Sequence, residues 1–271
     1  MTDIFHYEAD TVDVEGRDLP GLKARFLVDH VGNGDVVLDV GCGGGKMLRT
    51  LAEHRPATVR LGCDRKPPQR TDVDFEFRLV GDDGRLPFDD ATVDAALLVD
   101  VLEHVDDPAA VLEEVARVLR PGGALLAFVP VEGQPLGWYR LFRAVLGRDL
   151  YLETKDHVQA FRHADVEDLV GRRFRIDERR YVYHLIGALM DAGLCALLRV
   201  PFVRRRFWAD SPYHNRSDPA PRSTVSRVFS AALVAGNRVA WAESRALARV
   251  RTSSAGVLLV ARPLVDRPFV D

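Results

Sequence analysis

Cysteine is scarce in this 271-residue sequence: Cys42, Cys63 and Cys195 are the only three, and they show neither CxxC pairing nor metal-site spacing. An odd, low count is typical of proteins in a reducing cytoplasm. Long apolar runs are missing too, because no segment has about 18 uncharged apolar residues in succession, so we expect no membrane span. The first ten residues are polar and acidic, which argues against a signal peptide. These absences together predict a cytoplasmic protein.

Lysine is also rare, with four among 37 basic residues, and the net charge of −3 hides an asymmetry along the chain. Residues 1–130 carry 25 acidic and 14 basic side chains, a net charge of −11, whereas residues 131–271 carry 15 and 23, a net charge of +8. Such polarisation indicates either that the second half faces something anionic or that the two halves attract each other. Charge alone leaves both interpretations open.

The first 130 residues alternate between predicted strands and helices. Continuous apolar runs are typical of parallel strands that are covered on both faces. The predicted strands are Val36–Val40, Val59–Cys63, Phe75–Val80, Val93–Val99 and Ala124–Val129, and the predicted helices are Lys46–His54 and Pro108–Leu119. This alternation predicts an α/β fold with a doubly wound, Rossmann-like, mostly parallel sheet, whose ligands bind at the carboxyl ends of its strands.

The second half is less regular and contains no motif that we can name. It predicts a short helix from Asp165, a strand over Phe174–Tyr183, an apolar helix over Leu185–Leu198, a long helix over Val225–Val250 and a last strand over Gly256–Ala261. We therefore expect an N-terminal helical segment (1–33), a core (34–183), a helical cap inserted before the last strand (184–252), and that strand with a tail (253–271).

A glycine-rich turn follows the first strand, in the segment VVLDVGCGGGKML at 36–48. The turn lacks the third glycine of a dinucleotide fingerprint, where Lys46 stands, and Met47 replaces the Ser or Thr of a phosphate P-loop. Asp39 lies directly before the turn, and its carboxylate would repel a pyrophosphate but attract an ammonium or sulfonium group. The turn therefore predicts a site for a cationic ligand.

Five motifs in order closely resemble class I S-adenosylmethionine-dependent methyltransferases, of the methyltransferase type 11 and ubiquinone-pathway kind. They are the D-x-G-x-G-x-G turn at 39–45, the acid ending LGCD at 61–64, GDDGRLPF at 81–88, VDAALLVDVLEHV at 93–105 and RVLRPGGAL at 117–125. The resemblance covers residues 34–130. It implies a seven-stranded sheet, S-adenosylmethionine as cofactor and S-adenosylhomocysteine as product.

The resemblance also implies which residues hold the cofactor. Asp39 and the turn would hold its methionine end, and Asp64 would accept hydrogen bonds from the ribose hydroxyls. Asp82 would accept from the adenine amino group, with the Asp83 backbone facing the ring, although an Asp-Asp-Gly sequence also suits a plain turn. The complete expected set is Asp39, Gly41, Cys42, Gly43, Gly45, Asp64, Arg65, Asp82, Asp83, Val99 and Asp100.

Catalytic residues should follow the fourth and fifth strands, where a base could remove a proton from an acceptor hydroxyl. The candidates for this base are His104 and His157, and the alternative is that close alignment of the acceptor with modest help suffices without a dedicated base. Asp100, Glu103 and His104 form DxxEH, which looks like the ExxEH metal cluster of small-RNA 2′-O-methyltransferases, and His157 could complete it. The same LEHV sequence recurs in relatives without a metal, so we favour no metal and keep this trio as the alternative.

The second half predicts a surface for an apolar partner. Residues 185–208, which end in the Arg204–Trp208 cluster, and the arginine-bearing helix at 225–250 are typical either of a membrane-surface anchor or of a cap over the substrate. We expect O-methylation of a small or lipid-linked acceptor, with no nucleic acid partner. The alternatives are a non-catalytic S-adenosylmethionine-binding or membrane-docking protein and a nicotinamide-dependent oxidoreductase. The sequence leaves the oligomeric state open.

Overall fold

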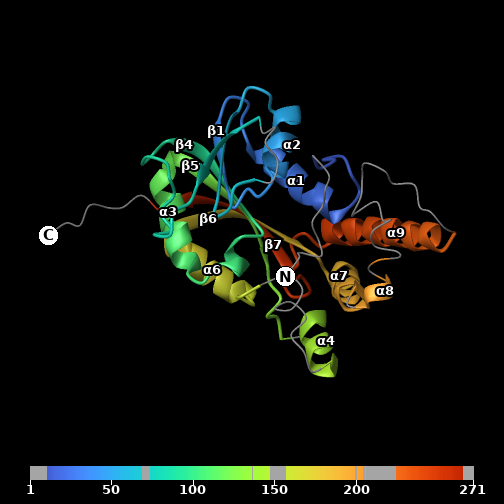
Figure 1. Cartoon of the computed structure of the whole chain (residues 1–271). Coiled ribbons are helices and arrows are strands. Elements are labelled where there is room, and N and C mark those ends of the chain that lie inside the picture. Colours follow the sequence, from blue (N-terminus) through green and yellow to red (C-terminus); the bar gives the residue numbers. More distant parts are fainter. Residues whose placement is uncertain are drawn as a thin grey trace.

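The computed structural model describes residues 11–68, 74–135, 137–146, 157–198, 200–203, 205 and 224–264, and its centre is one seven-stranded sheet (Figure 1). The strand order is β3-β2-β1-β4-β5-β7-β6, with β7 antiparallel to both of its neighbours and all other pairs parallel. The strands are β1 (Val36–Val40), β2 (Val59–Asp64), β3 (Glu76–Leu79), β4 (Val93–Val99), β5 (Leu119–Pro130), β6 (Phe174–Val182) and β7 (Gly256–Pro263). The predicted fold class is therefore confirmed.

Helices cover both faces of the sheet because its central strands are apolar on both sides. Successive residues of β1 alternate between two cores: Val37 packs with α1 (Leu19–His30) and α2 (Lys46–His54), whereas Leu38 packs with α3 (Pro108–Val118) and α6 (His163–Gly171). Side chains on a strand point alternately to opposite faces, so an all-apolar strand requires this double cover. Figure 1 shows α1 and α2 on one side of the sheet and α3 and α6 on the other.

A second group of helices lies beside the sheet. This cap comprises α4 (Trp138–Leu146), α7 (Leu185–Leu198), α8 (Pro201–Val203) and α9 (Thr224–Ala246), and α7 to α9 lie in the chain between β6 and β7 (Figure 1). Helices α7 and α9 approach closely because Gly187 faces Ala240 and Gly236 faces Met190. The Glu243 carboxylate of α9 accepts hydrogen bonds from the Ile186 and Gly187 N–H groups at the start of α7.

Two predicted boundaries are wrong. Strand β5 starts at Leu119, five residues before the predicted Ala124, because Leu119 pairs with Val93 across an irregularity in the register. Helix α9 ends at Ala246 instead of Val250, because the Ala248 carbonyl leaves the helix and accepts a hydrogen bond from the Tyr181 N–H of β6. The other predicted helices and strands agree with the structure to within two residues at their ends.

Several predictions fall on residues outside the description. These are residues 1–10 of the N-terminal segment, residues 265–271 of the predicted tail and, apart from Arg205, the Arg204–Trp208 cluster. Of the N-terminal segment, the described part contains the predicted helix as α1. Across the described ranges, no helix combines the length and the hydropathy needed to cross a membrane.

Candidate active site

The glycine turn joins β1 to α2 and is closed by backbone hydrogen bonds. The Gly41 and Cys42 N–H groups both donate to the Cys63 carbonyl of the neighbouring β2, at 2.8 and 3.1 Å. Gly45, the residue before α2, has φ +75°, and a Cβ built there would lie 2.1 Å from the Phe75 ring. The turn therefore brings backbone N–H groups and the N-terminus of α2 to an open edge of the sheet, where a ligand carboxylate can be received.

Asp39 occupies the predicted position at this edge and is 4% exposed. Burial, and then the negative charge of Asp64, raise the pKa of Asp39 from 3.8 to about 7. No group among the described residues donates a hydrogen bond to its carboxylate. A cationic group at this place would relieve both the desolvation and the repulsion, so the site fits the ammonium end of S-adenosylmethionine.

The structure places Asp64 at the end of β2, beside the turn. Its Oδ2 accepts a hydrogen bond from the Gly43 N–H at 2.9 Å, and its Oδ1 accepts from the Lys66 N–H at 3.2 Å. Arg65 follows as an exposed residue, and Cys42 is buried within the turn with a raised thiol pKa, caused mainly by burial. Asp64 thus orders the turn while remaining at the position where the ribose is expected.

Asp82 and Asp83 lie in an exposed turn over residues 81–84, closed by a hydrogen bond from the Gly84 N–H to the Gly81 carbonyl. The Asp83 carboxylate accepts from the Arg85 N–H at 3.1 Å, which is ordinary turn chemistry. The roles of Asp82 and Asp83 toward adenine stay predictions, because the same geometry suits a plain turn.

A cavity of about 330 Å³ lies between the carboxyl ends of the strands and the cap. Its walls come from α1, the start of α2, the ends of β4 and β5, α4, α7 and the residues before β7. The cavity wall includes Lys23, Lys46, Met47, Val99, Asp100, His104, Phe128, Glu132, Tyr139, His157, Tyr183, Asp191 and Ala255. The cavity therefore joins the predicted cofactor edge to the predicted catalytic histidines.

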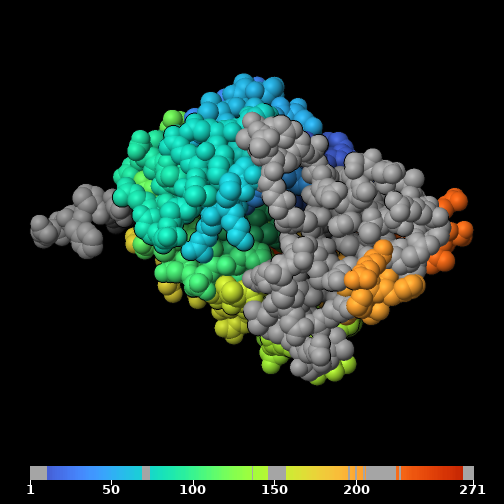
Figure 2. All heavy atoms as spheres, in the orientation of Figure 1, coloured from blue at the N-terminus to red at the C-terminus, as the bar shows by residue number. Residues whose placement is uncertain are grey.

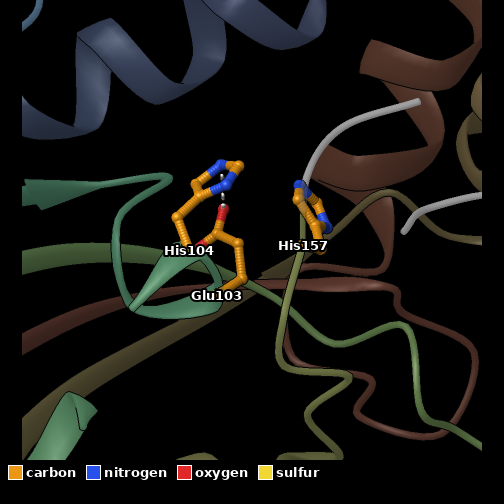
Figure 3. Close-up of side chains that lie close together, drawn as sticks. All are labelled: Glu103, His104 and His157. Carbon is orange, nitrogen blue, oxygen red and sulfur yellow. Dashed lines mark ion pairs between the residues drawn. The ribbon is translucent and has the colours of Figure 1, made fainter. Parts of the chain in front are cut away.

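Both candidate histidines lie on this wall, and an acid that the sequence did not indicate accompanies them. The rings of His104 and His157 meet edge to face, with centroids 4.8 Å apart (Figure 3). The carbonyl of Glu103 accepts hydrogen bonds from the Val158 and Gln159 N–H groups, which fixes the His157 segment beside the short helix η1 (Leu102–His104). His157 Nδ1 lies 3.0 Å from the buried Glu132 Oε2.

Glu103 is fully buried, and neither of its carboxylate oxygens has a hydrogen-bond partner. Its carboxylate points to His104, whose Nε2 lies 4.0 Å from Oε1 (Figure 3). Burial, and then the negative charge of Asp100, raise the pKa of Glu103 well above its usual value. Ligand atoms of Glu103, His104 and His157 all lie within 4.8 Å of one another, so these three could hold a divalent cation.

Asp100 does not join this group. It has φ +55° at the end of β4, and its carboxylate forms an ion pair with Lys23 of α1 at 2.7 Å. The predicted trio of Asp100, Glu103 and His104 is therefore replaced in space by Glu103, His104 and His157. Sequence reasoning also missed Lys23, Tyr139 and Glu132. Of these, only Glu132 could have been expected from the fold, because it is an acid two residues after the end of the central strand β5, where ligands bind in such sheets.

Comparison with known proteins agrees with this geometry. Residues 38–127 match the family described as the methyltransferase domain. An uncharacterized methyltransferase of Mycobacterium tuberculosis is 38% identical over 118 residues, which cover 42% of this chain and 47% of that protein. The ubiquinone biosynthesis O-methyltransferase of Xylella fastidiosa is 29% identical over 189 residues, covering 58% of this chain and 74% of that protein. The chain thus spans about half the length of the mycobacterial relative.

Solved structures share the fold. The [4+2]-cyclase SpnF superposes with a TM-score of 0.56 at 17% identity, over 91% of this chain and 82% of that one. The MccD protein gives a TM-score of 0.56 at 14% identity, over 89% and 96%. Together with the sheet order, the family match shows that residues 38–127 belong to a class I S-adenosylmethionine-dependent methyltransferase domain.

Proposed function

We propose that this protein transfers a methyl group from S-adenosylmethionine to a hydroxyl of a small, largely apolar or lipid-linked acceptor. The observation that carries this proposal is the buried Glu132–His157 pair, which lies on the wall of the same cavity as the end of β4. A histidine oriented by a carboxylate is suited to remove a proton from a hydroxyl as the new bond forms. S-adenosylmethionine supplies an activated methyl group on its sulfonium.

The residues divide into two roles. Asp39, Asp64 and the glycine turn hold the cofactor. Glu132 accepts the hydrogen bond from His157 Nδ1, so the neutral imidazole carries its lone pair on Nε2, the nitrogen suited to act as the base. The cap borders the cavity and would limit the access of water to the acceptor, which favours proton transfer to His157 over transfer to solvent.

The cavity wall supports an acceptor with a substantial apolar part. Met47, Phe128, Tyr139, Tyr183 and Ala255 provide the apolar part of the wall. The ubiquinone biosynthesis O-methyltransferase among the relatives bears a name that fits an apolar acceptor hydroxyl. Acceptor sites of this kind are mostly apolar, with a few polar groups that set the orientation.

A divalent cation is a second candidate for activating the hydroxyl. Glu103, with two buried oxygens that no group satisfies, is the observation that favours it. With Glu103, His104 and His157 as ligands, such an ion would acidify the acceptor hydroxyl. Chelation separates the two candidates: turnover that resists a chelator supports His157 as the base, whereas turnover lost on chelation and restored by Mg²⁺ or Mn²⁺ supports the cation.

The experiment that tests methyl transfer uses S-adenosylmethionine with a labelled methyl group and an extract of the source cells, with Asp64→Ala as the control. The extract is then divided between an organic and an aqueous phase. We expect label above the control in the organic phase. Label in the aqueous phase would contradict the lipid-like acceptor. Binding of S-adenosylhomocysteine without transfer to any offered hydroxyl compound would favour the non-catalytic alternative.

A further inference from the structure

Helix α9 carries its positive charge in one row. Arg227, Arg238 and Arg245 are separated by 11 and 7 residues, intervals that return to the same side of a helix within about 20°. All three side chains are exposed. No carboxylate among the described residues forms an ion pair with any of them. Figure 2 shows the start of α9, in orange-red, at the molecular surface.

An apolar stripe runs beside this arginine row. Val228 and Val239 are 64% and 49% exposed and lie about 100° round the helix axis from the arginines, and Val225, which is 60% exposed, lies about 150° from them. Exposed alanines fill the stripe between them. A soluble surface rarely places a row of valines beside a row of arginines without any acid, whereas a helix lying in the headgroup region of a membrane combines these two faces.

The acids of the cap helices point inward. Helices α7, α8 and α9 contain two acidic residues, Asp191 and Glu243. Asp191 accepts a hydrogen bond from the Tyr139 hydroxyl at 2.9 Å, and Glu243 accepts from the Ile186 N–H at 2.9 Å. The exposed charge on these helices is therefore positive throughout their described length, which complements an anionic surface.

The arginine row leads into a groove of about 630 Å³ between α1, β6 and the end of α9. The guanidinium of Arg245 lies 4.9 Å from the Trp241 ring centroid, and that of Arg17 lies 5.8 Å from it. Arg249 follows in the turn after α9 and lines the same groove.

The groove also contains three acids, and each has a basic partner from the same wall. Glu15 and Asp29 pair with Arg25, and Glu178 pairs with Arg180. No described carboxylate forms an ion pair with Arg245 or Arg249. These two arginines therefore supply the positive charge that a phosphate in the groove would meet, next to a tryptophan of the kind found at membrane boundaries.

We propose that α9 docks this protein on an anionic phospholipid surface, with its valine stripe against the lipid, its arginine row on the phosphates and the groove beside Trp241 receiving a headgroup. The proposal goes beyond methyl transfer, and its test does not depend on turnover. Docking of this kind would bring the cap, which borders the acceptor cavity, to the surface of a membrane.

The test is co-sedimentation of the full chain with phosphatidylcholine vesicles that contain or lack phosphatidylglycerol. We expect binding only to the anionic vesicles. Arg227→Gln with Arg238→Gln should bind roughly thirty-fold more weakly, because each arginine near an anionic surface strengthens binding by about five-fold. Arg172→Gln with Arg173→Gln, in the turn between α6 and β6, changes the total charge equally and should bind like the unaltered protein. Equal unfolding temperatures and S-adenosylhomocysteine affinities establish that both variants fold.

Two further results separate the apolar from the ionic contribution. Val228→Ser with Val239→Ser should weaken vesicle binding at low and high salt alike, whereas the arginine variant should differ from the unaltered protein mainly at low salt. Absence of binding to anionic vesicles, equal binding to both vesicle types, or equal loss in the matched control would overturn the proposal. So would a dimer in light scattering that the arginine variant dissociates, because the face would then belong to a second copy.

Discussion

Asp39 is a binding residue that works against the stability of the ligand-free fold. Its folded-state pKa lies near 7 and above the ordinary value, so the folded protein holds a proton that the unfolded chain has already released. Stability is therefore lost as the pH rises from about 4 to about 7, and the loss is complete above that range. The cation of the cofactor restores the folding stability that the buried Asp39 charge costs, so ligand binding is coupled to folding.

Asp39→Asn should therefore stabilise the ligand-free protein by about 2–4 kcal/mol at pH 8, and by almost nothing at pH 4. The same substitution should weaken S-adenosylhomocysteine binding by about 10- to 100-fold, because a charge-assisted contact is lost. Thermal unfolding and calorimetric titration across this pH range would measure the two effects. Asp89→Asn, at an exposed position, is the matched control. A variant that loses stability at pH 8 would contradict the assignment.

The Glu132–His157 pair leads to a prediction about proton transfer. His157→Ala should lower kcat by about 10²–10⁴-fold, as expected for removal of a general base. Glu132→Gln keeps the hydrogen bond to Nδ1 but removes the charge, so kcat should fall by about ten-fold with KM unchanged.

The acid limb of the pH–rate profile should also move to lower pH in Glu132→Gln, because the imidazolium loses a neighbouring negative charge. A merely structural role for Glu132 would leave this profile in place. A profile unchanged in both variants would remove His157 from the proton transfer.

The turn between β1 and α2 contains glycines that are needed for different reasons. Gly45 has a left-handed backbone, and its missing Cβ leaves room for the Phe75 ring. Gly44 differs, because a Cβ there would meet nothing within 4 Å and its φ is not positive. Adjacent glycines therefore have different reasons for being there: Gly45 is required by the fold, and Gly44 leaves space where the ligand is expected.

Gly45→Ala should destabilise the protein by about 3 kcal/mol, from backbone strain and from the clash with Phe75. Gly44→Ala should change unfolding free energy by less than about 1 kcal/mol while weakening S-adenosylhomocysteine binding. Chemical denaturation and titration of both variants measure these outcomes. Phe75→Leu should recover part of the loss in Gly45→Ala. Equal stability of the two alanine variants would show that the turn does not hold the ring as described.

Helices and strands with a clear apolar spacing were predictable from the sequence. Helix and strand ends that depend on contacts with distant segments were not. Helices α2 and α7 have the predicted bounds, and β4 does too, because their apolar spacing and their turn residues agree. The end of α9 at Ala246 was not visible in its apolar spacing, since a hydrogen bond between Ala248 and Tyr181 of β6 ends it. Long-range pairing of this kind leaves no local pattern.

The whole molecule separates into an acidic methyltransferase domain and a more basic second half, and the acceptor cavity lies where the domain meets the cap. Helices α4 and α7 pack through an apolar cluster that includes Tyr139, Ala188 and Ala192, and the Tyr139 hydroxyl donates a hydrogen bond to Asp191. Both residues line the cavity. The cap wall is thus held together by groups that the acceptor would touch.

Tyr139→Phe should raise the acceptor KM by about three- to ten-fold and lower stability by about 1 kcal/mol, because the half-buried Asp191 loses the hydrogen bond from the Tyr139 hydroxyl. The affinity for S-adenosylhomocysteine should not change, since the expected cofactor residues come mainly from the β1–α2 turn and the end of β2 and none from α4 or α7. Steady-state kinetics with the identified acceptor and calorimetric titration with the product measure the two quantities. A matching loss of cofactor affinity would contradict a cavity divided in this way.

The local sequence by itself determined most strands and helices and the glycine turn, because turn chemistry and apolar periodicity are properties of neighbouring residues. The motifs that resemble a known family added the seven-stranded sheet and the expected roles of Asp39 and Asp64. Only the tertiary structure decided that Glu132 meets His157 and that Asp100 turns to Lys23. These partners come from segments 25 and 77 residues apart, which pack together only when the sheet and the cap close the cavity. Contacts across such distances follow from packing, which no local pattern encodes.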